Sequence, residues 1–219
     1  MPELPEIEVI SRLLGEAVAG AEVESVLAPG LNTVKTFRPA PQVLEGSELT
    51  GIRRRGKVFL LDSDSGHSVL IHLMSAGRLQ LFDERAKLTD RRSRLLIRLA
   101  DGRELRLREF GTHQRAWARV VETDHVHEDE SLSGLGPEAW PEPPGLAGLL
   151  DEPRPLYSVL RDQRVITGIG RTGTWCGYRH CGIKPDFVAM AKGVASGYAA
   201  IGCCVTTEAV FEMFKDDAA

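Results

Sequence analysis

Apolar residues between positions 6 and 18 recur at intervals of three and four, the spacing of one face of an α-helix. Further along, short segments alternate apolar residues with Arg and Glu, as half-buried antiparallel strands do. Leu95, Ile97 and Leu99 show this alternation, and the Asp101-Gly102 pair after them predicts a tight hairpin turn. We therefore expect a helix at 6–18 and strands at 23–27, 43–53, 58–62, 68–73, 79–82, 94–99, 104–108 and 116–121.

The pattern changes after residue 121. Residues 122–155 are acidic and rich in Pro and Gly, which is typical of a connector between domains. Residues 156–170 begin a short helix that ends at Gly168-Ile169-Gly170, and residues 171–219 differ in their glycine and cysteine usage. The sequence therefore predicts four parts, at 1–121, 122–155, 156–170 and 171–219. The first part is a β-sandwich or barrel with a leading helix.

The composition is that of a globular protein. With 219 residues, of which 42% are hydrophobic and 26% charged, the chain is not collagen-like, coiled-coil or wholly disordered. The first six residues carry two acids and no basic region, unlike a secretory signal. No apolar run approaches the roughly 20 residues that span a bilayer. We expect a soluble cytoplasmic protein that does not bind membranes.

Charge is unevenly distributed along the chain. The net charge is −4, but residues 51–119 hold 16 Lys and Arg against 8 Asp and Glu, a local excess of +8. Residues 122–152 hold 9 acids and no Lys or Arg. A basic block of this kind is typical of a surface that follows a phosphate backbone, although an ordinary solvated sheet face has the same composition.

The four cysteines all lie in the last 44 residues and form no C-x-x-C pair. Their spacing does not favour a zinc site, so we expect no metal. Buried free thiols in a reducing compartment are the better interpretation.

The N-terminus carries candidate chemistry. Removal of Met1 would expose the secondary amine of Pro2, with a pKa of about 8 that leaves part of it unprotonated at neutral pH. Such an amine attacks aldehyde-type carbons and forms an iminium. Glu3 and Glu6 stand beside it at a helix start, where a carboxylate is stabilised and could move protons. The alternative is an ordinary first helical turn, where Pro and Glu are common.

A second candidate is the basic segment Arg53-Arg54-Arg55-Gly56-Lys57, which leads into an apolar strand. It is either a basic turn on a solvated edge or a phosphate-binding segment. In the second case Arg54 and Arg55 bind DNA, and Lys57 projects from a strand end into a cleft.

Five short motifs follow one another in the first 170 residues. They are Pro2-Glu3-Leu4-Pro5-Glu6-Ile7-Glu8, Arg54-Arg55-Gly56-Lys57, His72-Leu73 leading to Gly77-Arg78-Leu79, Arg108-Glu109-Phe110-Gly111, and residues 160–170. Together they closely resemble the formamidopyrimidine-DNA glycosylase / endonuclease VIII family, in which the last segment is the turn of a helix–two-turn–helix motif. The resemblance implies a β-sandwich lobe and a helical lobe that hold damaged double-stranded DNA, with a flipped, oxidised base as substrate.

The same resemblance implies roles for single residues near the N-terminus. Pro2 would be the nucleophilic amine, Glu3 an acid/base carboxylate, and Glu6 a supporting group. Lys57 would contact a phosphate near the lesion and take an electrostatic part in catalysis.

Further roles concern DNA contacts. Arg108 and Phe110 would fill the space left by the flipped base, with Phe110 as a stacking wedge. The family's third wedge residue is a Met, but here Met74 stands one position early and Ser75 takes the aligned place. Arg171 stands where the family has an Asn that holds the DNA backbone, so it is a further candidate DNA contact. The zinc finger usual in the family is not found.

The last fifty residues resemble a different family. Gly170-Arg171-Thr172-Gly173-Thr174-Trp175, His180 to Asp186 and Ala191-Lys192-Gly193 are similar to class III pyridoxal-phosphate aminotransferases, over about 168–217. That resemblance places the aldimine lysine at Lys192. The carboxylate that pairs with the pyridine nitrogen would align with Gln163, and without it the ring is a poor electron sink. Lys192 is therefore interpreted as a bystander, and the chain as a fusion of two families.

We therefore expect an α+β protein: an N-terminal β-sandwich with a leading helix, a truncated helix–two-turn–helix lobe and an α/β-type C-terminal fragment. The expected function is base-excision DNA repair by a monomeric, nucleoid-associated N-glycosylase with abasic-site lyase activity, impaired by the C-terminal fusion and needing no cofactor. The alternatives are a pyridoxal-phosphate aminotransferase fragment and an inactive DNA-binding remnant.

Overall fold

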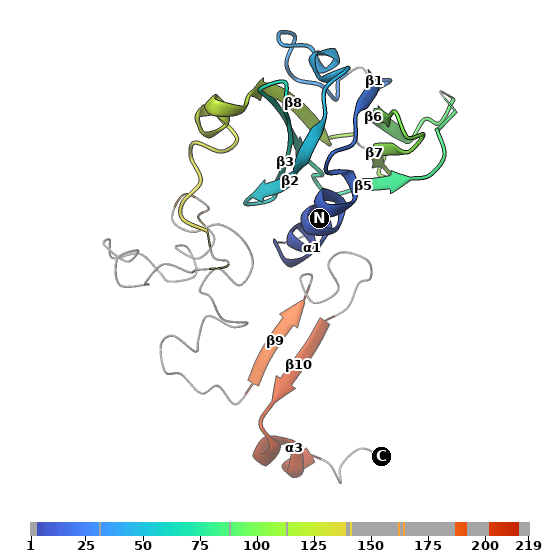
Figure 1. Ribbon diagram of the computed structural model, residues 1–219. Coiled ribbons are helices and arrows are strands. Elements are labelled where there is room, and N and C mark those ends of the chain that lie inside the picture. The colour runs from blue at the N-terminus through green and yellow to red at the C-terminus, as the bar shows by residue number, and fades with distance from the viewer. Residues whose placement is uncertain are drawn as a thin grey trace. The chain divides into compact units, whose positions relative to one another are not determined.

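The computed structural model describes residues 4–30, 32–87, 89–112, 114–138, 141, 162, 164, 187–191 and 202–214. The chain divides into two compact units, Met1–Leu135 and Gly136–Ala219. The first contains one long helix and eight strands, which Figure 1 colours from blue to yellow-green.

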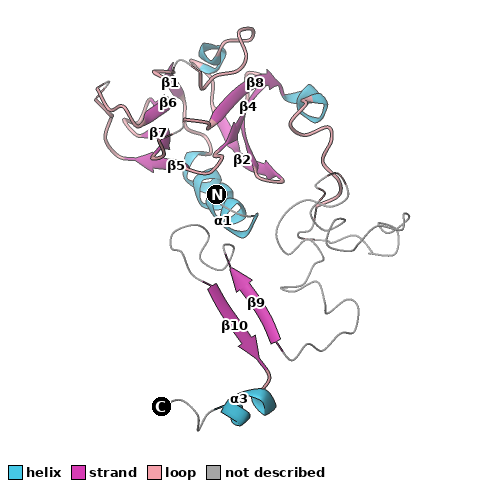
Figure 2. Ribbon diagram, turned by 180° about the vertical axis from the view of Figure 1, so that it is seen from behind, coloured by secondary structure: helices cyan, strands magenta, loops and turns pink. Residues whose placement is uncertain are grey.

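The eight strands of the first unit form two four-stranded antiparallel sheets. One has the order β1-β6-β7-β5 and the other the order β2-β3-β4-β8 (Figures 1 and 2). The strands are β1 (Val23–Leu27), β2 (Leu49–Arg55), β3 (Val58–Ser63), β4 (His67–His72), β5 (Gly77–Phe82), β6 (Ser93–Leu99), β7 (Glu104–Glu109) and β8 (Trp117–Glu122). The expected β-rich N-terminal domain with a leading helix is confirmed.

The core consists mainly of the apolar side chains at alternate strand positions that point inward from the two sheets. Leu105 and Leu107 on β7 are the register partners of Ile97 and Leu95 on β6, and all four are buried. The second sheet contributes Phe59, Leu61, Val69, Ile71, Ala118 and Val120 to the same core. Because alternate side chains of a strand point to opposite faces, the apolar positions seen in the sequence form one shared interior.

Helix α1 (Leu4–Val18) packs against β2, β3 and β5. Ile7 and Val18 are buried in the core, and Gly15 approaches Ile52 so closely that a Cβ atom would lie 2.9 Å from the Ile52 carbonyl oxygen. Arg103, just after the Asp101-Gly102 turn, donates from Nη1 to the Ala17 carbonyl oxygen at 2.7 Å. The Arg103 guanidinium satisfies a carbonyl oxygen of the last helical turn, and its positive charge interacts favourably with the negative end of the helix dipole.

One strand expectation is wrong in part. Residues 43–53 were expected to form a single strand, but Pro41–Leu44 is a 3-10 helix and β2 begins only at Leu49. Pro41 suits the first turn of a helix because it has no N–H to donate. Gly46, with a φ of +79°, then turns the chain before the strand. The expected Asp101-Gly102 turn is confirmed, with a φ of +94° at Gly102.

The outer face of the second sheet is also covered. The 3-10 helix η2 (Thr123–Glu128) places Val126, and the turn after it places Leu132, against Val58, Leu60 and Leu70. The compact unit therefore continues to Leu135.

The second unit contains β9 (Phe187–Ala191), paired antiparallel with β10 (Gly202–Thr206), and helix α3 (Glu208–Phe214). Val205 on β10 is half exposed. Most of the expected helix–two-turn–helix segment at 156–170 lies outside the described residues. Among the residues that are described, no helix is both long and apolar enough to cross a membrane.

Candidate nucleic-acid interface

The residues proposed from the sequence fall into two sets. Pro2, Glu3, Arg171 and Lys192 lie outside the described residues. The described set is Glu6, Arg54, Arg55, Lys57, Arg108 and Phe110. Glu6 lies half-buried in the first turn of α1.

The basic segment forms the hairpin between β2 and β3. Because β2 ends at Arg55 and β3 begins at Val58, Gly56 and Lys57 are the two turn residues. Gly56 has a φ of +56°, a left-handed conformation that short hairpin turns require and that glycine adopts at little cost. The turn therefore places Lys57, half-buried, at the tip of the hairpin.

Two arginines of this hairpin bind other parts of the protein. Arg54 Nε lies 2.5 Å from Glu8 Oε2 on α1, and only 6% of the Arg54 side chain is exposed. Arg55 Nη2 donates to the Leu135 carbonyl oxygen at 3.1 Å. Both residues were expected to bind DNA. In this structure they hold α1 and the segment after β8 against the hairpin.

His72 ends β4 beside this turn, as the register partner of Val58. Its ring stacks on Trp117 with 5.6 Å between ring centroids. Burial, and then the positive charge of Lys57, lowers the pKa of His72, so the ring is neutral at neutral pH. The Met74 N–H donates to His72 Nδ1 at 3.1 Å, and an unprotonated nitrogen is needed to accept it.

The turn from β4 to β5 is tightly built. Met74 has a φ of +50°, which is uncommon for a residue other than glycine. The Gly77 N–H donates to the Leu73 carbonyl oxygen at 2.8 Å, and a Cβ atom on Gly77 would lie 2.4 Å from that same oxygen. The Ala76 carbonyl oxygen accepts a hydrogen bond from the Phe110 N–H at 3.2 Å. This turn thus anchors the backbone of Phe110.

Phe110 follows β7 and is 49% exposed. Arg108 Cζ lies 5.0 Å, and Arg92 Cζ 5.1 Å, from the centroid of its ring, within the range of cation–π attraction. Asp90 Oδ2 lies 3.6 Å from Arg108 Nε. An exposed aromatic ring flanked by guanidinium groups suits both stacking on bases and binding of phosphates.

Glu109, between Arg108 and Phe110, is buried. Its Oε1 accepts hydrogen bonds from the Arg115 N–H at 2.6 Å and the Ala116 N–H at 3.0 Å. It therefore ties the segment after Phe110 back to the end of β7. This role of Glu109 was not predicted from the sequence, although Glu109 continues the inward-facing positions of Leu105 and Leu107, where a carboxylate needs partners.

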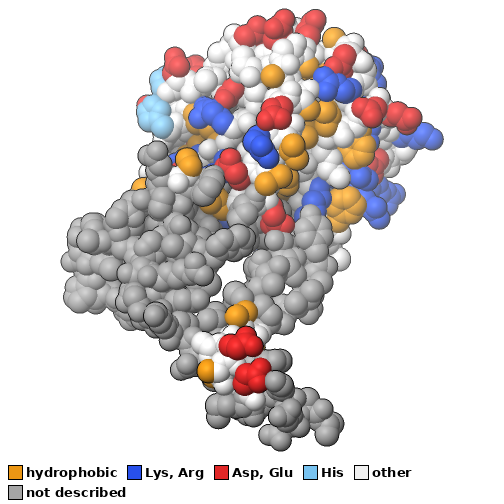
Figure 3. Space-filling view, turned by 60° about the horizontal axis from the view of Figure 1, so that its bottom comes forward, with side chains coloured by type: hydrophobic (Ala, Val, Ile, Leu, Met, Phe, Trp, Pro, Cys, Tyr) orange, Lys and Arg blue, Asp and Glu red, His pale blue; other side chains and the backbone are white. Residues whose placement is uncertain are grey.

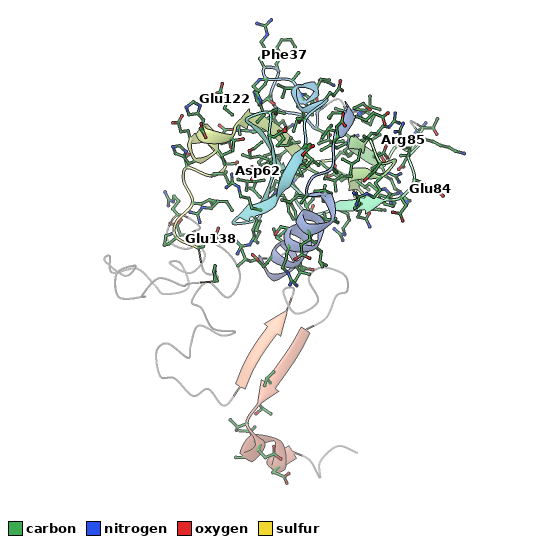
Figure 4. All side chains as sticks on the ribbon, in the orientation of Figure 1. Phe37, Asp62, Glu84, Arg85, Glu122 and Glu138 are labelled. Carbon is green, nitrogen blue, oxygen red and sulfur yellow. The ribbon has the colours of Figure 1, made fainter. Side chains whose placement is uncertain are left out.

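Eight of the 16 Lys and Arg residues of the basic block pair with carboxylates of the described residues. Arg53 Nε lies 2.6 Å from Asp62, which Figure 4 labels on β3, and Arg85, also labelled, pairs with Glu24. In Figure 3, Lys and Arg side chains are mixed with acids and apolar patches on the visible face of the first unit. The arginines of the block that pair with carboxylates are Arg53, Arg54, Arg85, Arg98, Arg103, Arg106, Arg108 and Arg119.

The described ranges of the chain contain no group of three or more His, Cys, Asp or Glu that could hold a metal ion. Cys204 is a free and exposed cysteine, so the expectation of buried thiols is wrong for this residue. It lies on β10, which pairs with β9 in a two-stranded sheet.

Comparison with known proteins divides the chain in two. Residues 1–113 match the family model of the formamidopyrimidine-DNA glycosylase N-terminal domain. The formamidopyrimidine-DNA glycosylase of Moorella thermoacetica is 34% identical over 181 residues, which cover 78% of this chain and 63% of that protein. A Lactococcus lactis Fpg solved with DNA containing N7-benzyl-Fapy-dG has a TM-score of 0.67 at 24% identity, over 77% of this chain and 63% of that one.

The C-terminal part matches a second family. Residues 161–218 match the class III aminotransferase family model. The taurine–pyruvate aminotransferase of Rhodobacter capsulatus is 69% identical over 61 residues, which are 27% of this chain but 13% of that protein. The chain thus spans less than two thirds of the glycosylases it matches and about an eighth of the aminotransferases.

Proposed function

Because the chain belongs to the formamidopyrimidine-DNA glycosylase family through residues 1–113, we propose that it acts in base-excision repair of double-stranded DNA. In this proposal it removes oxidised bases and cleaves the resulting abasic site by β-elimination. The observation that carries the proposal is Phe110, half exposed and flanked by two guanidinium groups, at the end of a strand of this family's sandwich.

The proposed covalent step uses the amine of Pro2 after removal of Met1. The amine nitrogen attacks the sugar C1′, and the bond from C1′ to the base breaks with its electron pair leaving on the base. The proton that the amine loses passes to the departing base, so the nitrogen keeps the lone pair that the next step needs. Glu3 donates a proton to the ring oxygen, which opens the sugar and leaves an iminium between Pro2 and C1′. Loss of a proton from C2′ then expels the 3′ phosphate, and water releases the amine.

The described residues would support this step without forming covalent bonds to the sugar. Glu6, in the first turn of α1, would stabilise charge beside the amine. Lys57 at the hairpin tip would hold a phosphate near the lesion. The Arg54–Glu8 ion pair would position the helix that carries the N-terminus. An amine and carboxylates carry out the whole sequence, so the proposal calls for no metal or cofactor.

The C-terminal part would lower this activity. In the proposal, residues 156–170 are a truncated helix–two-turn–helix, and residues 171–219 are an aminotransferase-derived fragment in which Lys192 takes no part. Arg171 would stand at the position of a DNA-backbone contact. We therefore expect slower base excision than by a family member with a complete helical lobe.

Borohydride trapping on an abasic-site duplex tests the proposal. The full chain with Met1 removed should give a stable adduct, which peptide mapping places on Pro2. Pro2→Gly or retained Met1 should reduce the adduct sharply, whereas the control Lys192→Ala should not. An adduct on Lys192 would overturn the assignment, as would an absorbance change on adding pyridoxal phosphate that Lys192→Ala abolishes.

A further inference from the structure

Arg92 lies on the Phe110 ring but comes from a distant part of the sequence. It belongs to the connector between β5 and β6, whereas Phe110 follows β7. Its Cζ lies 5.1 Å from the ring centroid, nearly the distance of Arg108 on the same ring. Arg92 is exposed, whereas Arg108 is half-buried and paired with Asp90. Of these two cations, Arg92 is thus the one that faces solvent.

The connector that carries Arg92 is fixed to the sheet. The Ala86 N–H donates to Glu104 Oε1 at 2.9 Å, and Arg106 donates to the Glu84 carbonyl oxygen. Glu104 and Arg106 lie on β7 and are themselves buried. Glu84, labelled in Figure 4, marks where the connector leaves β5.

The end of the connector is fixed beside Phe110. Asp90 accepts hydrogen bonds from the Ser93 hydroxyl at 2.8 Å and the Arg92 N–H at 3.0 Å. The Arg92 carbonyl oxygen accepts from the Glu109 N–H at 2.9 Å. A hydrogen bond therefore joins the backbone of Arg92 to that of Glu109, the residue before Phe110. This bond fixes the position of the Arg92 backbone, and so the point from which its side chain extends, relative to Phe110.

We propose that Arg92 is a DNA-binding residue that acts with Phe110. When one face of the Phe110 ring stacks on a base, the Arg92 guanidinium stays beside the ring and donates hydrogen bonds to a phosphate near the lesion. A planar guanidinium both stacks on an aromatic face and binds phosphate with several donors, and its attraction to the ring strengthens when water is excluded. This inference rests on the proposed function and adds a residue that no sequence motif contained.

Binding of the full chain to two duplexes of one sequence tests it. One duplex carries a tetrahydrofuran abasic-site analogue and the other is undamaged. Arg92→Ala should weaken binding to the tetrahydrofuran duplex about three- to tenfold, and binding to the undamaged duplex by less. Arg91→Ala removes the same charge one residue away, and it should weaken binding to both duplexes slightly and by the same factor.

A second variant separates charge from stacking. Arg92→Lys should restore most of the affinity for undamaged duplex but not the preference for tetrahydrofuran, because an ammonium group has no planar face. If the wild-type chain prefers the tetrahydrofuran duplex, but Arg92→Ala weakens both duplex affinities only as much as Arg91→Ala does, the proposed role of Arg92 is overturned. The proposed function is not affected by that result. A wild-type chain without that preference would overturn the proposed function as well.

Discussion

Gly77 gives a sharp test of how the β4–β5 turn supports Phe110. In Gly77→Ala the new Cβ would lie 2.4 Å from the Leu73 carbonyl oxygen and 2.9 Å from the Leu73 Cα. Both are backbone atoms, so no side-chain rotation relieves the contact. The Leu73 oxygen is also the acceptor of the Gly77 N–H, so the hydrogen bond that closes the turn must lengthen. Overpacking of this kind costs about 1–3 kcal/mol, and we expect the upper half of that range.

The expected loss is measurable by thermal unfolding. For a domain of this size, about 2–4 °C is lost per kcal/mol, so Gly77→Ala should lower the Tm by roughly 4–12 °C. Gly134→Ala is the matched control, because a Cβ there meets nothing within 4 Å. Since Ala76 anchors Phe110, Gly77→Ala should also reduce the preference for abasic-site DNA, measured well below its Tm. Equal Tm values for the two variants would refute the reasoning.

Three further predictions follow from single contacts. Glu8→Gln should lower the free energy of unfolding by about 1–3 kcal/mol in urea titrations and slow borohydride trapping, because the buried Arg54 guanidinium loses the Glu8 carboxylate. Arg54→Met should lower it less, because it removes the buried charge and leaves a Glu8 carboxylate that water can solvate. The folded state holds the pKa of His72 below 6.5, so the contribution of His72 to stability is present above pH 6.5 and is lost as the pH falls below 6.5. His72→Gln should therefore flatten the part of the Tm–pH curve below pH 6.5. Lys57→Ala should weaken binding to undamaged duplex and reduce the slope of log K against log salt by about 0.9, and an unchanged slope would show that Lys57 contacts no phosphate.

Much of the sandwich was predictable because its elements are locally periodic. Alternation placed Leu95, Ile97, Leu105 and Leu107 on one face, and the structure buries all of them together. The Asp101-Gly102 turn was predictable because its chemistry lies within two residues. The strand expected at 43–53 was wrong because turn chemistry at its start, a proline followed by a left-handed glycine, outweighed the apolar pattern.

The side-chain contacts of the candidate site were not predictable in the same way. Arg92 reaches Phe110 only because β7 lies between β5 and β6, which brings the connector of those strands beside the end of β7. Sheet order is a long-range property that no local spacing determines. Glu109 did leave a local signal, since it occupies an inward-facing position, but its partners Arg115 and Ala116 follow from the loop it closes.

The charge of the basic block shows why composition alone was ambiguous. An excess of +8 over residues 51–119 is the same number whether the arginines face DNA or carboxylates of their own domain. The structure separates these cases, because Arg54 is buried against Glu8 whereas Arg92 is exposed on an aromatic ring. A buried pair contributes little to counterion release, since its charge is already neutralised and desolvated. Recognition of DNA by this domain should therefore depend on a few placed cations near Phe110 and Lys57, and its salt dependence should be much weaker than 16 basic residues would give.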